Sequence, residues 1–116
     1  MKKILIVDDD LSIIRACIRS LSRDYYVFST STGEEALSLI KNHQPDLVIL
    51  DWRLRSQIDG KEILLILKRD YPHIPVFVVT GSIHSKDEIE SLGANRFLLK
   101  PVENLKEIIL KALPPL

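Results

Sequence analysis

Short, uninterrupted runs of branched apolar residues alternate along this chain with segments whose apolar residues are spaced as on a helix. Strands buried on both faces have runs of the first kind, and amphipathic helices have the second pattern. Their alternation predicts an α/β fold built on a parallel sheet. The strongest runs are Ile4 to Val7, Leu47 to Leu50 and Val76 to Val79, and weaker runs at Tyr26 to Phe28 and Arg96 to Leu99 bring the predicted strands to five.

Helices are predicted where apolar residues recur at i, i+3, i+4 and i+7. This spacing occurs from Ile14 to Leu21, with Cys17 as a small core residue, and again from Leu105 to Ala112. A third helix follows Gly60 and carries an unbroken apolar run, Ile63 to Leu67. One buried helix face needs fewer apolar residues than that, so Leu65 or Ile66 is a candidate for contact with a partner.

Two further helices are predicted from their N-terminal caps. Thr32 with Glu35, and Ser85 with Glu88, have the spacing of a capping box, in which two side chains satisfy free backbone amides. The segment 86–92 has only two apolar anchors, so we expect this helix to be the most mobile. The predicted first residues are Gly33 and Lys86.

Length, charge and cysteine content narrow the class of protein. A chain of 116 residues fits one domain, 1–116, with residues 114–116 as the possible start of a linker. Its 16 basic and 16 acidic residues cancel without a basic run, so we expect neither direct nucleic acid binding nor a charged membrane contact. The single cysteine cannot form an internal disulfide. No apolar run is long enough for a membrane span or a signal peptide, and we therefore expect the protein in the cytoplasm.

Four of the predicted strands end in polar residues that suit the binding of phosphate or a metal ion. In an open parallel sheet, ligands bind outside the carboxyl ends of the strands, so these residues should meet at one edge. The first strand ends in Asp8, Asp9 and Asp10, the third in Asp51, the fourth in Thr80, and the fifth in Lys100 with Pro101.

Carboxylates from two neighbouring strands repel one another unless a cation lies between them. Mg²⁺ meets this need, since it binds carboxylates, carbonyl oxygens, waters and phosphate oxygens. A nearby lysine and hydroxyl suit a phosphoryl group, and Asp51 is then free to act as nucleophile. The simpler reading is that an acidic cluster caps the next helix, and for Asp10 this is the reading we adopt.

The residues in this order, together with Asp59-Gly60 and Gly93-Ala94, resemble the response-regulator receiver domain over essentially the whole chain. The resemblance implies a flavodoxin-like, doubly wound (βα)₅ fold. Its five parallel strands would lie in the order 2-1-3-4-5, with five helices around them.

The resemblance also implies how the acidic residues divide their roles. Asp51 would be the phosphoacceptor and a metal ligand, and Asp9 a direct Mg²⁺ ligand. Asp8 would bind the metal through water or act as an electrostatic partner, and the backbone carbonyl of Arg53 would complete the protein ligands.

Further roles are implied around the phosphoryl group. Thr80 would bind a phosphoryl oxygen in the active state, and Lys100 would pair with the acyl phosphate. The Lys100-Pro101 peptide bond would be cis. Phe97 resembles the switch aromatic that turns inward when the threonine moves, and the alternative for Phe97 is an ordinary packing residue of an edge strand.

A domain of this kind takes its phosphoryl group from a sensor histidine kinase or phosphotransfer protein, or from a small donor such as acetyl phosphate. It catalyses its own phosphorylation and dephosphorylation and is otherwise not an enzyme. Phosphorylation shifts a pre-existing equilibrium and signals to an output domain or downstream protein. The expected output surface is the fourth helix, fifth strand and fifth helix, and a homodimer is possible.

The chain departs from the family pattern in two places. The usual Met-Pro pair after the acceptor is replaced by Leu54-Arg55 in a loop that is one residue longer, and Arg53 could place a cation beside an entering water. The interval from Thr80 to Lys100 is about two residues shorter than usual, which predicts a truncated or irregular fourth helix.

Three other functions compete with this prediction. An aspartate-based phosphatase of the haloacid dehalogenase type needs a second acid where Arg53 stands, and a cap domain for which the chain has no room. A pseudo-receiver interaction module would keep the acidic pocket without using phosphorylation. Flavin binding lacks a Ser/Thr/Gly-rich loop after the first strand. The histidines show no ligand spacing and are expected at the surface: His43, His73 and His84.

Overall fold

The computed structural model describes residues 1–116 as five strands and five α-helices that alternate along the chain. The strands are β1 (Lys3–Val7), β2 (Tyr26–Thr30), β3 (Leu47–Asp51), β4 (Val76–Thr80) and β5 (Arg96–Leu99). The helices are α1 (Leu11–Leu21), α2 (Gly33–His43), α3 (Gly60–Asp70), α4 (Lys86–Ser91) and α5 (Leu105–Ala112). One turn of 3₁₀ helix, Ile83–Ser85, precedes α4.

The strands form one parallel sheet in the order β2-β1-β3-β4-β5, which confirms the predicted topology. Val7, the last residue of β1, pairs with Thr30 on one side and Leu50 on the other. Asp51 in turn pairs with Val79. The central strands therefore end at almost the same level, and the residues that follow them share one edge of the sheet.

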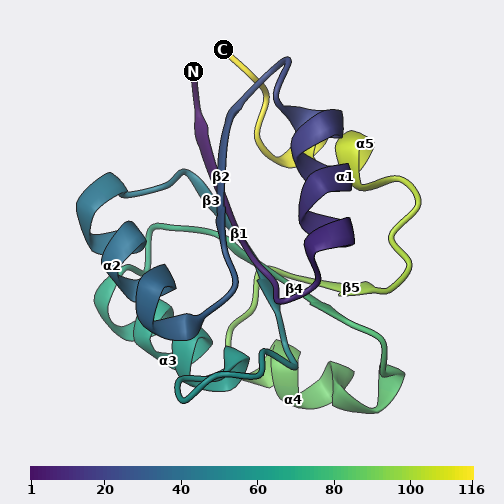
Figure 1. Ribbon diagram of the computed structural model, residues 1–116. Helices are drawn as coiled ribbons and strands as arrows, with labels where there is room; N and C mark the ends of the chain where they lie inside the picture. The colour runs from purple at the N-terminus through teal and green to yellow at the C-terminus, as the bar shows by residue number, and fades with distance from the viewer.

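Helices cover both faces of the sheet, α1 and α5 on one and α2, α3 and α4 on the other (Figure 1). Alternate residues of β1 point to opposite faces, because side chains alternate along a strand. Leu5 and Val7 join the core under α2, α3 and α4, whereas Ile4 and Ile6 join the core under α1 and α5. Cys17 packs in that second core and is 7% exposed, as predicted for a small core residue.

The predicted caps had different outcomes. The Thr32 side chain accepts a hydrogen bond of 3.2 Å from the Glu35 amide, and α2 begins at Gly33 as predicted. The Ser85 cap was wrong. The fourth helix does begin at residue 86, but Ser85 makes no side-chain cap hydrogen bond, because the 3₁₀ turn already places its backbone in a helical conformation, with φ of −87° and ψ of −3°.

Helix α4 is short and irregular, as the interval before Lys100 predicted. It has 6 residues, follows directly on the 3₁₀ turn, and buries only Ile89. Helix α3 is better anchored, with Ile63, Leu64 and Leu67 fully buried. Leu65 on the same helix is 44% exposed, which keeps it a candidate contact residue.

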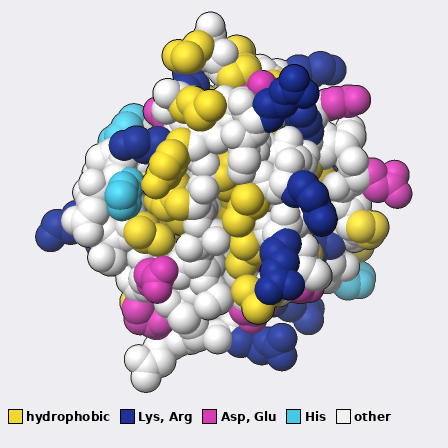
Figure 2. Space-filling model, turned by 45° about the horizontal axis from the view of Figure 1, so that its top comes forward, with side chains coloured by type: hydrophobic (Ala, Val, Ile, Leu, Met, Phe, Trp, Pro, Cys, Tyr) yellow, Lys and Arg dark blue, Asp and Glu magenta, His cyan; other side chains and the backbone are white.

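On the face shown in Figure 2, hydrophobic side chains reach the surface in several separate groups, and charged side chains of both signs lie around them. The exposed large hydrophobic residues come from different elements, Leu11, Tyr26 and Ile83 among them. All three histidines are exposed, as predicted. None of the helices is long and apolar enough to cross a membrane.

Candidate functional site

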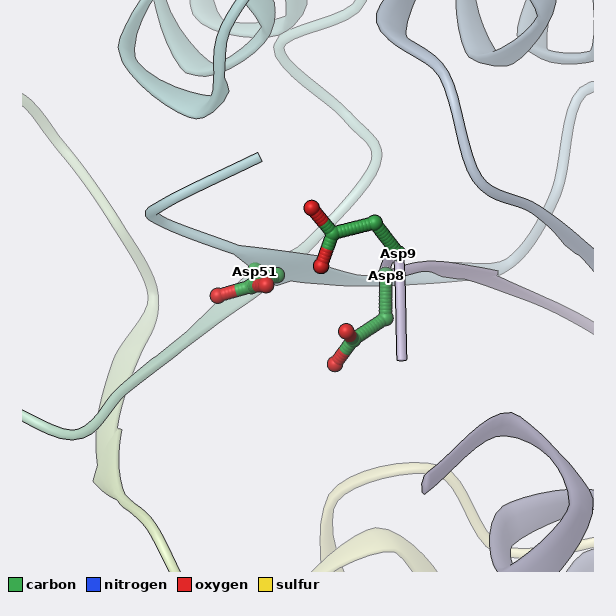
Figure 3. Close-up of side chains that lie close together, drawn as sticks. All are labelled: Asp8, Asp9 and Asp51. Atoms are coloured by element: carbon green, nitrogen blue, oxygen red, sulfur yellow. The ribbon is translucent and has the colours of Figure 1, made fainter. Parts of the chain in front are cut away.

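Three carboxylates meet at the carboxyl ends of β1 and β3. Asp8 and Asp9 follow β1, Asp51 ends β3, and one oxygen of each lies within 4.8 Å of the others. Figure 3 shows the Asp8 and Asp9 side chains leaving the end of β1 in different directions beside Asp51. Asp8 is 4% exposed and Asp51 6%, so two of the three acids are buried.

Asp10 lies next to this cluster and is the N-terminal cap of α1. Its side chain accepts hydrogen bonds from the amide and hydroxyl of Ser12, at 2.9 and 2.6 Å, and caps α1. These bonds lower the pKa of the Asp10 carboxyl, as expected for a carboxylate that accepts hydrogen bonds at a helix start. The prediction of Asp10 as a helix cap is confirmed.

Lys100 reaches the acids from the residue after β5. Its ammonium group lies 3.2 Å from an Asp8 oxygen and 3.5 Å from Asp51 Oδ1. Burial alone would lower the pKa of Lys100, but attraction by the two carboxylates outweighs burial and raises it. The following peptide bond, Lys100–Pro101, is cis. Lys100 therefore stays charged and neutralises part of the negative charge of the cluster.

Asp51 carries the clearest electrostatic conflict in the site. Burial raises its pKa first, and repulsion by Asp8 raises it further, while Lys100 and a hydrogen bond from the backbone of Arg53 act in the opposite direction. The Arg53 amide donates that bond to Oδ1 at 3.2 Å. The net effect is a pKa of Asp51 above the usual carboxyl value. A bound cation would stabilise the ionised carboxylate against this repulsion, so the site favours cation binding.

Thr80 ends β4, the strand next to β3, and Phe97 lies within β5. Thr80 is 1% exposed, and its hydroxyl accepts a hydrogen bond of 3.2 Å from the Ser82 amide. Gly81, rather than Thr80, lines the hollow above the acids. Phe97 is half-buried against the core under α2, α3 and α4 and pairs with Val78 in the sheet.

Arg55 contributes a contact that sequence reasoning did not identify. Its backbone amide and its Nε both donate to Asp9 Oδ2, at 3.2 and 3.3 Å. The sequence had marked the Leu54-Arg55 pair as a departure and had assigned the nearby cation to Arg53. Arg53 also lines the hollow but forms no ion pair with the acids. Leu54 is 4% exposed and packs in the core.

The hollow above the acids has a volume of about 410 Å³ and no hydrophobic lining residue. Oxygen ligands from several carboxylates, in a setting that raises the pKa of one of them, are the donor set that Mg²⁺ prefers. The residues present therefore fit a magnesium ion. The lining residues are Asp8, Asp9, Asp10, Asp51, Arg53, Arg55, Gly81 and Lys100.

A larger groove of about 840 Å³ begins at the same acids and runs between α1 and α5. Its walls include Ile13 and Cys17 from α1, Val102 from the segment that leads into α5, and Leu105 at the start of α5. The groove is mostly apolar, in contrast to the hollow above the acids. Asp8, Asp51 and Lys100 line both, so the charged site lies where the two meet.

Comparison with known proteins agrees with this arrangement. A family model described as the response regulator receiver domain matches residues 4–112. Over 103 residues, the chain is 36% identical to the alkaline phosphatase synthesis transcriptional regulatory protein PhoP of Bacillus subtilis, covering 86% of this chain and 42% of that protein. It is also 36% identical over 102 residues to response regulator MprA of a Mycobacterium species, covering 85% and 44%. The chain thus spans less than half the length of these relatives.

Solved structures with similar folds cover nearly the whole chain. A CheY-like response regulator receiver domain protein from Methanospirillum hungatei has a TM-score of 0.85 and 30% identity, with 97% of this chain and 90% of that chain covered. The response regulator TrrA of Thermotoga maritima, solved in complex with Mg(2+)-BeF, has a TM-score of 0.86 and 29% identity, with 97% and 100% covered.

Proposed function

Because the chain belongs to the response regulator receiver domain family, we propose that it accepts a phosphoryl group on Asp51 in a Mg²⁺-dependent reaction. The observation that carries this proposal is the cluster of Asp8, Asp9 and Asp51 within 4.8 Å, with Lys100 beside Asp8 and Asp51. A buried acid with a raised pKa, a counter-cation and an open polar hollow are what an aspartyl-phosphate site requires.

In the proposed reaction, Asp51 attacks through Oδ2, because the Arg53 amide and Lys100 both contact Oδ1. Oδ2 forms a bond to phosphorus while the bond to the donor breaks, and the electron pair leaves on the donor's imidazole nitrogen or carboxylate oxygen. Lys100 neutralises charge on the transferring oxygens. Asp9, Asp51 and the Arg53 carbonyl would hold a bound Mg²⁺, with Asp8 as a ligand through water or as an electrostatic partner, and the ion would supply further charge neutralisation at the phosphoryl oxygens.

The proposed switch uses the strands next to the acceptor. Thr80 ends the neighbouring strand, and its hydroxyl, which accepts a hydrogen bond from the Ser82 amide, would donate one to a phosphoryl oxygen. Phe97 on the adjoining strand would then turn inward. The short helix α4, with only Ile89 buried, is the element in this region that least resists such a change.

The partners and setting of the domain are part of the same proposal. The phosphoryl donor would be a sensor histidine kinase or a phosphotransfer protein, and an output domain or downstream protein would read α4, β5 and α5. A homodimer of the phosphorylated form is compatible with this surface, and the cytoplasm is the expected compartment. Residues 1–116 would act as a single receiver unit, with 114–116 as the start of a linker.

The test is the intact mass of the protein after incubation with acetyl phosphate and Mg²⁺. We expect a single phosphoryl adduct that is absent from the Asp51→Asn variant and from a sample with EDTA. Because a short-lived phosphate escapes mass measurement, the fluorescence of Trp52 on addition of beryllofluoride and Mg²⁺ provides a second readout. Trp52 is half-buried and follows the acceptor directly. No response in either assay would refute phosphorylation and favour a pseudo-receiver interaction module.

A further inference from the structure

Arg55 holds the metal-facing acid Asp9 by two hydrogen bonds to a single oxygen. The backbone amide donates to Oδ2 at 3.2 Å and the guanidinium Nε donates to the same atom at 3.3 Å. No other group donates a hydrogen bond to the Asp9 side chain, and no other cation pairs with it. Arg55 is therefore the one side-chain cation that pairs with Asp9.

The two cations of the site divide the three acids between them. Lys100 pairs with Asp8 and Asp51, and Arg55 pairs with Asp9. The two cations differ in how firmly they are held, because the Lys100 side chain is 24% exposed and the Arg55 side chain is 90% exposed. Arg55 can leave its carboxylate without disturbing any packing, whereas Lys100 is embedded in the site.

We propose that Arg55 is an internal competitor of the divalent cation, occupying Asp9 in the metal-free domain and moving away when Mg²⁺ binds. This inference rests on the proposed metal site. Whichever oxygen of Asp9 took the ion, the guanidinium would lie a few ångströms from a doubly charged cation, and that repulsion exceeds the weak attraction of an exposed ion pair. Arg55 thus sets the Mg²⁺ concentration at which the site fills.

The residue type at this position decides whether the competition exists. Proline, the second residue of the Met-Pro pair that Leu54-Arg55 replaces, has neither an amide hydrogen nor a charge. It would leave Asp9 free of both donors. Arg53, the other arginine at the hollow, does not pair with Asp9, so the effect belongs to position 55.

The experiment is a Mg²⁺ titration of the metal-free protein followed by the fluorescence of Trp52, the single tryptophan. The variant Arg55→Gln keeps the backbone amide and removes the cation. Arg69→Gln is the matched control, because it also breaks an exposed arginine–carboxylate pair, with Asp70 at 2.8 Å, at the opposite end of α3. Thermal unfolding without metal verifies that each variant is folded.

We expect Arg55→Gln to bind Mg²⁺ about two- to fivefold more tightly than the unchanged protein at low ionic strength, which corresponds to an exposed ion pair. Arg69→Gln should bind as the unchanged protein does. The difference at position 55 should shrink as NaCl is raised, because salt screens exposed charges. In ¹⁵N-resolved spectra, the Arg55 Nε–H signal should shift as the metal is added, in step with the fluorescence change.

Equal or weaker Mg²⁺ binding by Arg55→Gln would overturn the inference and would show that Arg55 is neutral or helps to orient Asp9. In that case, phosphorylation and its metal dependence would stand unaffected. If neither the unchanged protein nor any variant responded to Mg²⁺, the proposed metal site itself would fail, and the inference with it. The two failures are therefore distinguishable in one titration.

Discussion

Replacing Asp51, the proposed phosphoacceptor, by its uncharged isostere should make the metal-free domain more stable. Asp51→Asn removes a buried charge from among Asp8 and Asp9 and preserves the shape of the side chain. The amide oxygen of asparagine can still accept the hydrogen bond that the Arg53 backbone donates to Oδ1. The change therefore isolates electrostatics from packing.

The magnitude follows from the distances in the site. At an effective dielectric constant of about 20, two carboxylates within 4.8 Å of each other repel by ~3.5 kcal/mol or more, and Asp8 is the acid that opposes ionisation of Asp51. Lys100, at 3.5 Å, returns ~5 kcal/mol. Burial is the largest cause of the raised pKa and turns the balance against the charged form, so we expect a gain of about 1–2 kcal/mol, or roughly 3–10 °C in Tm.

The gain should depend on pH with a definite sign. The folded pKa of Asp51 is raised, so in the folded protein ionisation is opposed, and stability falls as the pH rises from the usual carboxyl pKa to the raised value. Above that window the penalty is constant. The advantage of the asparagine variant should therefore be full above the raised pKa and vanish in acid, below the usual carboxyl pKa.

The assay is urea unfolding of both proteins, with EDTA, at neutral pH and in acid. Adding Mg²⁺ should stabilise the unchanged protein and stabilise the variant less. Asp70→Asn serves as a control of opposite sign, because Arg69 lowers the pKa of this exposed acid. An asparagine variant that was less stable than the unchanged protein at neutral pH would refute the electrostatic reasoning.

Three other perturbations have expected outcomes that the same unfolding measurements can check. A methyl group on Gly60 would lie 2.6 Å from the Asp51 carbonyl oxygen, so Gly60→Ala should lower the free energy of unfolding by about 1–3 kcal/mol. A methyl group on Gly81 would meet no atom within 4 Å, so Gly81→Ala should be nearly neutral. Equal effects of the two changes would contradict the packing at the start of α3. Thr80→Val should lower the free energy of unfolding by about 1 kcal/mol, because the Ser82 amide loses its acceptor. It should also reduce the stabilisation that beryllofluoride gives the unchanged protein. Tyr25→Phe removes the hydroxyl that donates to the Leu113 carbonyl and should cost about 1 kcal/mol, with faster amide hydrogen exchange after α5; unchanged exchange would show that this bond does not hold the segment.

The strands were predictable because burial on both faces demands continuous apolar sequence. The ends of the strands were less predictable, because the backbone hydrogen bonds between strands do not depend on whether a side chain is polar. Thr80 and Asp51 continue β4 and β3 by one residue beyond the apolar runs, and β2 extends to Thr30, which is buried opposite Val7. The sequence ended the third and fourth strands in Asp51 and Thr80, as the structure does, and Asp8 and Lys100 come one residue after β1 and β5.

The cap of α4 shows how a local motif can be outweighed by its surroundings. Ser85 and Glu88 have capping-box spacing, but Ser82 begins the helical turn earlier and its side chain accepts from the His84 amide. A serine already inside a 3₁₀ turn has no free first-turn amide to accept from. The start of the α-helix was correct, and the cap residue was wrong, because spacing alone does not show which serine comes first.

The acidic cluster was predictable as a cluster, since parallel strands end at one edge of the sheet. The pairing of its cations was not. Lys100 lies 92 residues from Asp8, and Arg55 lies 46 residues from Asp9. The reach of a long flexible side chain across neighbouring loops leaves no pattern in the sequence, so Arg53 and Arg55 could not be told apart before the structure placed them.

The place of Lys100 has a consequence for how the domain is made. During synthesis the acids emerge with β1 and β3, while the lysine that neutralises two of them comes only after β5, at the end of the sheet. A nascent chain that folded early would bring three carboxylates together with no partner for Asp8 or Asp51. The charged site thus opposes premature closure of the partial sheet, and the last strand delivers the cation that offsets part of the repulsion between the acids.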